Sequence, residues 1–134
     1  MTHHETPASE TASRPAVAGG ALRPAVILGG NRIPFARANT AYAEVGNQEM
    51  LTATLDGLVA RFGLQGERLG QVTAGAVLKH PRNFNLTREA VLGSALSAAT
   101  PAADVQVACA TGMEALGTLC LLYTSDAADE GLGV

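Results

Sequence analysis

Apolar residues follow one another along the chain in runs and periods that predict alternating strands and helices. Four of them, AVIL (25–28), stand just before Gly29 and Gly30 and predict a short buried strand. From Asn47 onward, apolar residues recur at helical spacing, which predicts a helix. Asn47 is expected to cap this helix and Gly63 to end it. The apolar face of this helix consists of Met50, Leu51, Thr54, Leu55, Leu58, Val59 and Phe62.

The next part of the chain repeats this order of strand and helix. QVTAGAVL (71–78) predicts a second buried strand, in which Gly75 indicates a bulge or a close approach of another backbone. A second helix is predicted over residues 86–96, with Asn85 as its cap. Its inward-facing candidates are Leu86, Ala90, Val91 and Ala95.

A third strand and helix complete the pattern. Val105 and Val107 alternate with polar neighbours and predict the strand, and Ala108-Cys109 marks the change to a helix. The segment 31–42 has no period, so we expect an irregular connection there. Alternating strands and helices predict an α/β domain with its helices packed on a sheet.

Composition narrows the class of protein. The 134 residues, 47% of them hydrophobic, are enough for about one soluble globular domain. We expect no membrane span and no secretory leader, and therefore a cytoplasmic location. Nine basic and twelve acidic residues give a net charge of −3 without a basic cluster, so we expect no nucleic-acid partner.

The first 22 residues are small, polar or proline, without a period. Ordering them would cost entropy with little burial to offset it, so we expect residues 1–22 to form a disordered arm. His3 and His4 lie in this arm, and we assign them no metal-binding role. The two cysteines, Cys109 and Cys120, are too few for a disulfide framework. If both lie on one helix, they are about 16 Å apart, so we expect free thiols.

Cys109 is the candidate catalytic residue, because it stands where a strand is predicted to give way to a helix. Unpaired backbone N–H groups and the helix dipole at such a position both stabilise a thiolate. Gly112 would let a ligand or another backbone approach closely. A second interpretation remains open on these residues alone, since free cysteine often packs as a small hydrophobe in a core.

Three stretches carry a resemblance to a known family. AVILGGNRIPFARANTAY (25–42) resembles the first strand and following loop of thiolases, with Ile33 in place of the usual threonine. NLTREAVLGSAL (85–96) is similar to the helix that precedes the thiolase nucleophile. VQVACATGMEAL (105–116) resembles the motif Cys-Ala-Ser-Gly that contains it, with Thr111 in place of serine. The sequence most resembles acetyl-CoA acetyltransferases and 3-ketoacyl-CoA thiolases of fatty-acid oxidation.

The resemblance implies an acyl transfer between CoA thioesters. The thiolate of Cys109 would attack an acyl-CoA, hold the acyl group and pass it to a second CoA species. The backbone N–H of Cys109 would be one donor of the oxyanion hole. The resemblance implies no metal and no organic cofactor, because CoA is the substrate. It also implies that the full-length parent is a homodimer or tetramer. The implied fold is the front of the first half of an αβαβα layered sandwich, with residues 23–118 as a partial N-terminal domain.

Other residues of the thiolase site have no counterpart here. The family's activating histidine, its second cysteine and its Asn-His element lie in the C-terminal half of its members. His80, followed by Pro81, superficially resembles the family's Gly-His-Pro, but Lys79 precedes it and it comes too early, so we expect a loop residue. We expect the chain alone to be inert as a catalyst.

The last residues depart from the family pattern. CLLYTSDAADE (120–130) resembles the translation of a transposase adapter used in short-read DNA sequencing. We therefore expect residues 119–134 to be non-native. Three acidic residues, Asp126, Asp129 and Glu130, belong to this segment, and without them the acids would equal the bases.

Three further hypotheses remain beside a truncated thiolase. The chain could be a non-catalytic dimerisation or interaction fragment, because thiolases pair through their N-terminal halves. It could belong to the ketoacyl synthases, condensing enzymes that share the thiolase fold, although NRIPFAR (31–37) favours a thiolase. Cys109 could also be a redox-sensing thiol, but it lacks a resolving cysteine at a suitable position.

Overall fold

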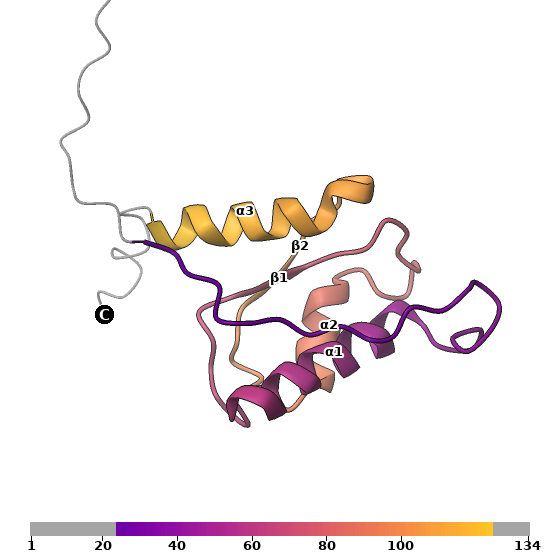
Figure 1. Ribbon diagram of the computed structural model, residues 1–134, viewed down its shortest axis with the longest axis horizontal. Coiled ribbons are helices and arrows are strands. Elements are labelled where there is room, and N and C mark those ends of the chain that lie inside the picture. The colour runs from indigo at the N-terminus through magenta and orange to yellow at the C-terminus, as the bar shows by residue number, and fades with distance from the viewer. Residues whose placement is uncertain (1–23, 125–134) are drawn as a thin grey trace, which may run out of the picture.

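The computed structural model describes residues 24–124, which form an α/β arrangement. Figure 1 shows helices α1 and α2 on one side of two short strands and α3 on the other. The predicted arm 1–22, with His3 and His4, lies outside the described residues, as does the end of the predicted non-native segment, 125–134. The elements in order are α1 (Asn47–Phe62), β1 (Val72–Ala74), α2 (Leu86–Gly93), β2 (Ala102–Asp104), the 3-10 helix η1 (Ala108–Ala110) and α3 (Thr111–Thr124).

Helix α1 has the bounds that its apolar period predicts. Gly63 ends it with a φ of 65°, a left-handed conformation that glycine adopts without steric cost. The predicted cap at its other end is wrong, because Gly46 occupies the N-cap position and no side chain caps the helix. Asn47 is the first helical residue, and its Nδ2 donates to the carbonyl oxygen of Leu78. The asparagine therefore joins α1 to the loop after β1.

Helix α2 begins as predicted but ends early. The Oδ1 atom of Asn85 accepts from the N–H of Arg88 at 2.9 Å, so the predicted cap is confirmed. The helix ends at Gly93 because the Ser94 hydroxyl donates to Val91 O at 2.8 Å and closes the last turn. Leu86, Ala90 and Val91 are buried as predicted, but Ala95 lies beyond the helix and is exposed.

The predicted first strand is absent. Residues 25–28 have no regular structure and are exposed, and they pair with no strand among residues 24–124. Hydrogen bonds instead tie the segment after them to α1: Arg61 Nη1 donates to Gly30 O at 2.8 Å, and Asn31 Nδ2 donates to Thr54 O at 3.0 Å. The prediction is wrong because a run of apolar residues forms a strand only where a neighbouring strand supplies hydrogen bonds. The irregular connection 31–42 is confirmed.

Strands β1 and β2 pair in parallel, and both differ from the predicted ranges. Strand β1 is three residues long within the predicted 71–78, and β2 lies at 102–104 rather than 105–107. The pairs are Val72 with Ala102, Thr73 with Ala103 and Ala74 with Asp104. One more hydrogen bond, from Val105 N to Ala74 O at 2.9 Å, continues the ladder before the chain turns away.

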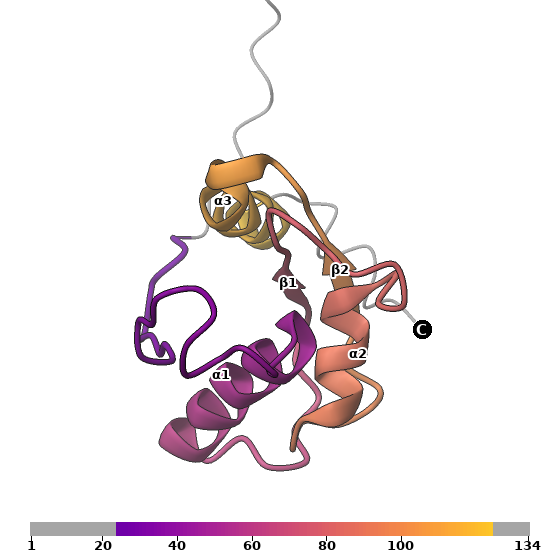
Figure 2. The same cartoon turned by 90° about the vertical axis from the view of Figure 1, so that its right-hand side faces the viewer.

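The core lies between the two-stranded sheet and the helices α1 and α2. Figure 2 shows these two helices side by side, with α3 beyond the strands. Burial of each large apolar side chain contributes about 1.5–3 kcal/mol. The central cluster consists of Val59, Val72, Val91 and Leu96, with Leu55, Leu64, Leu69 and Ala102 packed against it.

Among the helices of residues 24–124, none has the length and hydrophobicity needed to cross a bilayer.

Arg88 fixes the connection between α2 and β2. Its guanidinium donates to Thr100 O at 3.0 Å and to Ala98 O at 2.9 Å. Arg68 Nε donates to the carbonyl between them, Ala99 O, at 3.3 Å. These bonds satisfy three consecutive carbonyls of the connection and so set where β2 begins.

Candidate active site

The turn between β2 and α3 presents Cys109. The cysteine lies in η1, two residues before α3 begins, and its side chain is exposed. The predicted change to a helix at Ala108-Cys109 is therefore confirmed. Ala108 has a φ of 42°, a left-handed conformation that is uncommon for a residue other than glycine. Within residues 24–124, neither the N–H nor the sulfur of Cys109 has a hydrogen-bond partner.

Thr111 holds this turn together. Its hydroxyl accepts from the N–H of Val107 at 2.9 Å and donates to the carbonyl of Ala108 at 2.8 Å. The backbone N–H of Thr111 donates to the same carbonyl, and the residue is buried. Sequence reasoning noted Thr111 only as the replacement for a serine. The available signal was a hydroxyl at a helix start, where such side chains commonly bond the nearby backbone.

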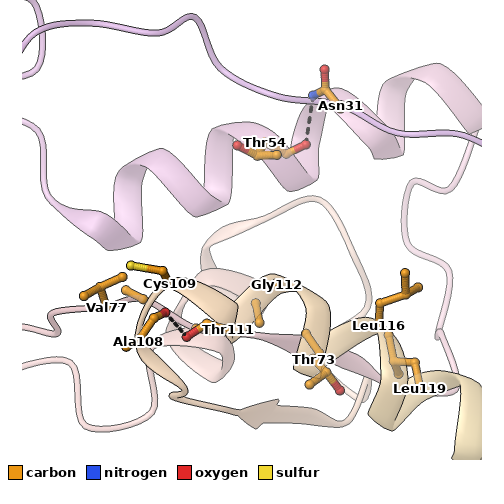
Figure 3. Close-up of a pocket in the computed structure, with 14 residues that line it drawn as sticks. Asn31, Thr54, Thr73, Val77, Ala108, Cys109, Thr111, Gly112, Leu116 and Leu119 are labelled. Atoms are coloured by element: carbon orange, nitrogen blue, oxygen red, sulfur yellow. Dashed lines mark hydrogen bonds between the residues drawn. The ribbon is translucent and has the colours of Figure 1, made fainter.

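An open cavity of about 680 Å³ lies beside the thiol. Figure 3 shows Cys109 and Val77 at one end of it and Leu116 and Leu119 at the other, with Asn31 across from them. Gly112 also lines the cavity, and a Cβ built on it would meet nothing within 4 Å. The thiol therefore faces a space that is large enough for part of a small-molecule substrate.

Gly75 brings β1 close to the turn between β2 and α3 that contains Cys109, which we call the active turn. A Cβ on this residue would lie 1.9 Å from Val105 O and 2.9 Å from Cγ2 of Thr111. Both distances are shorter than any tolerated contact, so only glycine fits without a shift of the backbone. The close backbone approach predicted at Gly75 is confirmed, and it puts β1 directly against the residues that hold Cys109.

A half-buried carboxylate at the end of β2 joins this strand to the loop after β1 and to the start of α2. Asp104 Oδ2 accepts from Lys79 Nζ at 2.8 Å and from Leu86 N at 2.9 Å, and Oδ1 accepts from Thr87 N at 2.7 Å. Burial alone would raise the pKa of Asp104, but hydrogen bonds from Lys79 and from these backbone N–H groups hold it below its ordinary value of 3.8. The carboxylate also lies at the N-terminus of α2, where a negative charge is favourable.

The other candidate residues lie apart from this site. His80 is exposed in a loop, as predicted, and its Nδ1 accepts from the N–H of Arg82 at 3.2 Å. It lines a separate cavity of about 340 Å³. Cys120 is exposed on α3, and both cysteines are free thiols, as predicted.

The pattern of strand, helix and cysteine turn has a counterpart among known proteins. The sequence-family model of the thiolase N-terminal domain matches residues 25–133 of this chain. This chain belongs to the thiolase family. The resemblance read from the three sequence stretches is thereby confirmed, and the family match favours thiolase over ketoacyl synthase. The thiolase match includes most of residues 119–134, so the proposed non-native origin of that segment stays a prediction, as does the domain boundary at 118.

Relatives of this thiolase chain include enzymes of animals and bacteria. The mitochondrial trifunctional enzyme subunit beta of Mus musculus is 31% identical over 126 residues, which are 94% of this chain and 26% of that protein. The 3-ketoacyl-CoA thiolase of Photorhabdus laumondii is 38% identical over 93 residues, 69% of this chain and 21% of the relative. The chain thus spans about a quarter of the length of these relatives.

A solved structure has the same fold. The crystal structure of the Bacillus anthracis acetyl-CoA acetyltransferase superposes with a TM-score of 0.60 at 20% sequence identity. The superposition covers 71% of this thiolase chain and 23% of the other. The predicted fold class, an incomplete α/β front part of the thiolase architecture, is confirmed.

Proposed function

We propose that this chain carries the nucleophile of a thiolase-type acyltransferase and that Cys109 is that nucleophile. The observation that supports this most directly is an exposed thiol at the start of α3, beside an open cavity, in a chain of the thiolase family. Relatives bear the names 3-ketoacyl-CoA thiolase and acetyl-CoA acetyltransferase. The substrate class that fits them is an acyl-CoA thioester, with fatty-acid oxidation as the metabolic setting.

The proposed step is a thioester exchange. The Cys109 thiol loses its proton to solvent, its sulfur forms a bond to the acyl carbon, and the bond from that carbon to the CoA sulfur breaks. The departing CoA thiolate takes up a proton from solvent. In a full-length parent, a second CoA species would then accept the acyl group. The exposed thiol of Cys109 lies two residues before α3 and lines the open cavity, so an acyl-CoA can reach it. The free N–H of Cys109 supplies one hydrogen bond to the developing oxyanion.

Turnover needs groups that the described residues do not bring to the thiol. His80 lies in a different cavity, and Cys120 is elsewhere on α3, so neither serves as the acid or base here. We therefore propose that the 134-residue chain forms the acyl-enzyme once and does not cycle. The proposed reaction requires no metal or organic cofactor, and the cytoplasmic location and the homodimer or tetramer of a full-length parent remain proposals.

Site-specific acylation tests this function. The chain is incubated with acetyl-CoA or acetoacetyl-CoA, and the acylated peptide is identified by mass spectrometry. We expect acyl transfer to Cys109 at a rate at least about ten times that at Cys120, because an oxyanion donor and a helix N-terminus act on Cys109 alone. Cys109→Ala is the matched control and should remove the labelled peptide.

Two results would contradict the proposal. Equal acylation of Cys109 and Cys120 would mean that the turn gives no advantage over an ordinary exposed thiol. Multiple turnovers by the chain, measured as release of free CoA beyond one equivalent, would mean that an acid or base for the second step is already present.

A further inference from the structure

The peptide between Ala108 and Cys109 has a fixed orientation. Its carbonyl oxygen, on Ala108, accepts hydrogen bonds from both the hydroxyl and the N–H of Thr111. Its N–H, on Cys109, has no partner among residues 24–124. No peptide bond of the described chain is cis, so the C=O and the N–H of this peptide point in opposite directions. Holding the carbonyl in the turn therefore points the Cys109 N–H outward.

We infer that Thr111 is a positioning residue, whose hydroxyl orients the 108–109 peptide so that the Cys109 N–H is available as the oxyanion donor. This inference rests on the proposed acyl transfer and adds a residue to its machinery. Thr111 does not touch the reacting atoms. It acts through the peptide whose carbonyl it binds, as Figure 3 shows for its bond to Ala108.

The same hydroxyl also holds the backbone on the other side of the turn. Thr111 Oγ1 accepts from Val107 N, so one side chain bonds the residues before and after the Val107–Ala108 peptide. Ala108 needs such restraint, because its φ of 42° is a left-handed conformation that is strained for a residue with a Cβ. Without the hydroxyl, Ala108 can relax toward negative φ and rotate the peptide that carries the Cys109 N–H.

Close packing against Gly75 keeps the side chain of Thr111 in place. Thr111 is buried, and its Cγ2 methyl faces Gly75 of the segment after β1, where a Cβ would come within 2.9 Å. The methyl thus fixes the rotamer by packing, while the hydroxyl makes the two hydrogen bonds. A valine at this position would keep the packing and lose only the hydrogen bonds.

Two reactions of the same thiol separate positioning from general structure. Acylation by acetoacetyl-CoA passes through a tetrahedral oxyanion, whereas alkylation by iodoacetamide displaces iodide at carbon and forms no oxyanion. We expect Thr111→Val to slow acylation of Cys109 about 10- to 100-fold, since a misdirected donor loses much of the effect of an oxyanion-hole group. Its alkylation rate should stay within about twofold, and Thr111→Ser, which keeps the hydroxyl, should recover the acylation rate.

Some results would overturn the inference. If Thr111→Val acylates Cys109 as fast as the parent chain, the hydroxyl has no part in presenting the donor. If acylation and alkylation fall together, Thr111 only maintains the fold. Failure of the parent chain to acylate Cys109 at all contradicts the proposed function instead, and the two failures are therefore distinguishable.

Amide hydrogen exchange, followed by NMR, tests the geometry without any acyl transfer and without a variant that has to fold. We expect the Cys109 amide of the parent chain to exchange at nearly its intrinsic rate, because it donates to no group. The Val107 amide should exchange at least about tenfold more slowly, because it donates to Thr111 Oγ1. A Cys109 amide protected as strongly as that of Val107 would overturn the assigned orientation.

Discussion

A single carboxylate, that of Asp104, joins three parts of the chain near the candidate site. It ends β2, pairs with Lys79 of the loop after β1, and accepts the first two N–H groups of α2. Both side chains of the ion pair are mostly buried, with relative exposures of 22% and 13%. Removing one member of such a pair leaves buried donors without a partner.

Replacing Asp104 with asparagine should destabilise the chain in a pH-dependent way. The folded-state pKa of Asp104 lies below its ordinary value of 3.8, so its stabilising effect is present above that pH and is lost as the pH falls through the folded pKa. We expect Asp104→Asn to lower the free energy of unfolding by about 1–3 kcal/mol at pH 7. The difference from the parent chain should shrink below about pH 4, as measured by urea unfolding.

Glu49 provides a matched control for this experiment. It also pairs with a basic residue, Arg82, but Arg82 Nη2 and Glu49 Oε1 are 3.8 Å apart. The side chains of Arg82 and Glu49 have relative exposures of 65% and 56%. Glu49→Gln should therefore change the free energy of unfolding by less than about 0.5 kcal/mol. Equal losses in the two variants, or a loss for Asp104→Asn that persists unchanged at pH 3, would contradict the role given to Asp104.

Individual residues of the site differ in how far the sequence reveals them. Cys109 could be predicted because the evidence for it is local: a strand pattern ends, a helix begins, and a motif surrounds it. The roles of Thr111 and Asp104 could not be predicted in this way. The bonds of Thr111 depend on the left-handed Ala108, and those of Asp104 join it to residues 17 and 18 positions earlier. Neither arrangement leaves a period or a composition in the sequence.

At the scale of elements, β1 and the active turn are coupled through Gly75. We expect Gly75→Ala to lower the free energy of unfolding by about 1–3 kcal/mol, because the new methyl would overlap Val105 O and press on Thr111. Thermal unfolding followed by circular dichroism measures the loss. Gly70→Ala is the control: a Cβ there meets nothing within 4 Å, so stability should stay within about 0.5 kcal/mol. Equal melting temperatures for the two variants would contradict the close approach.

The helices were more predictable than the strands for a physical reason. A helix satisfies its hydrogen bonds within one segment, so the apolar period fixed α1, and Asn85 marked the start of α2. A strand depends on its neighbours. The run at 25–28 has no pairing partner in the described chain, and the ladder of β2 lies three residues earlier than the alternation of Val105 and Val107 indicated.

At the scale of the whole molecule, α3 is covered on one side only. Among the elements of residues 24–124 it packs against β1 and η1, and neither α1 nor α2 contacts it. Met113 and Leu121 on this helix have relative exposures of 75% and 70%. Other large apolar side chains are exposed on segments outside α3, so the exposed apolar surface is not confined to this helix. They include Phe35, Leu78 and Phe84.

Scattered apolar patches predict open-ended self-association. We expect sedimentation velocity to show species that grow with concentration, without one preferred stoichiometry. Introducing Met113→Glu with Leu121→Glu should reduce the mean sedimentation coefficient, whereas Ala53→Glu with Ala60→Glu on α1 adds the same charge at exposed small residues and should reduce it less. A single well-defined dimer would contradict this prediction and favour the alternative function of an interaction module.

The hydrogen bonds by which Arg88 holds the α2–β2 connection affect how variants of this gene would be classified. Its two hydrogen bonds set where β2 starts, and the stretch from β2 leads within a few residues to the thiol. A screen that scores only loss of acylation at Cys109 would place Arg88 beside Cys109 among the essential positions. Lysine, which lacks the forked donor, would score almost as poorly as alanine. Sorting such hits therefore requires a solubility readout in the same library.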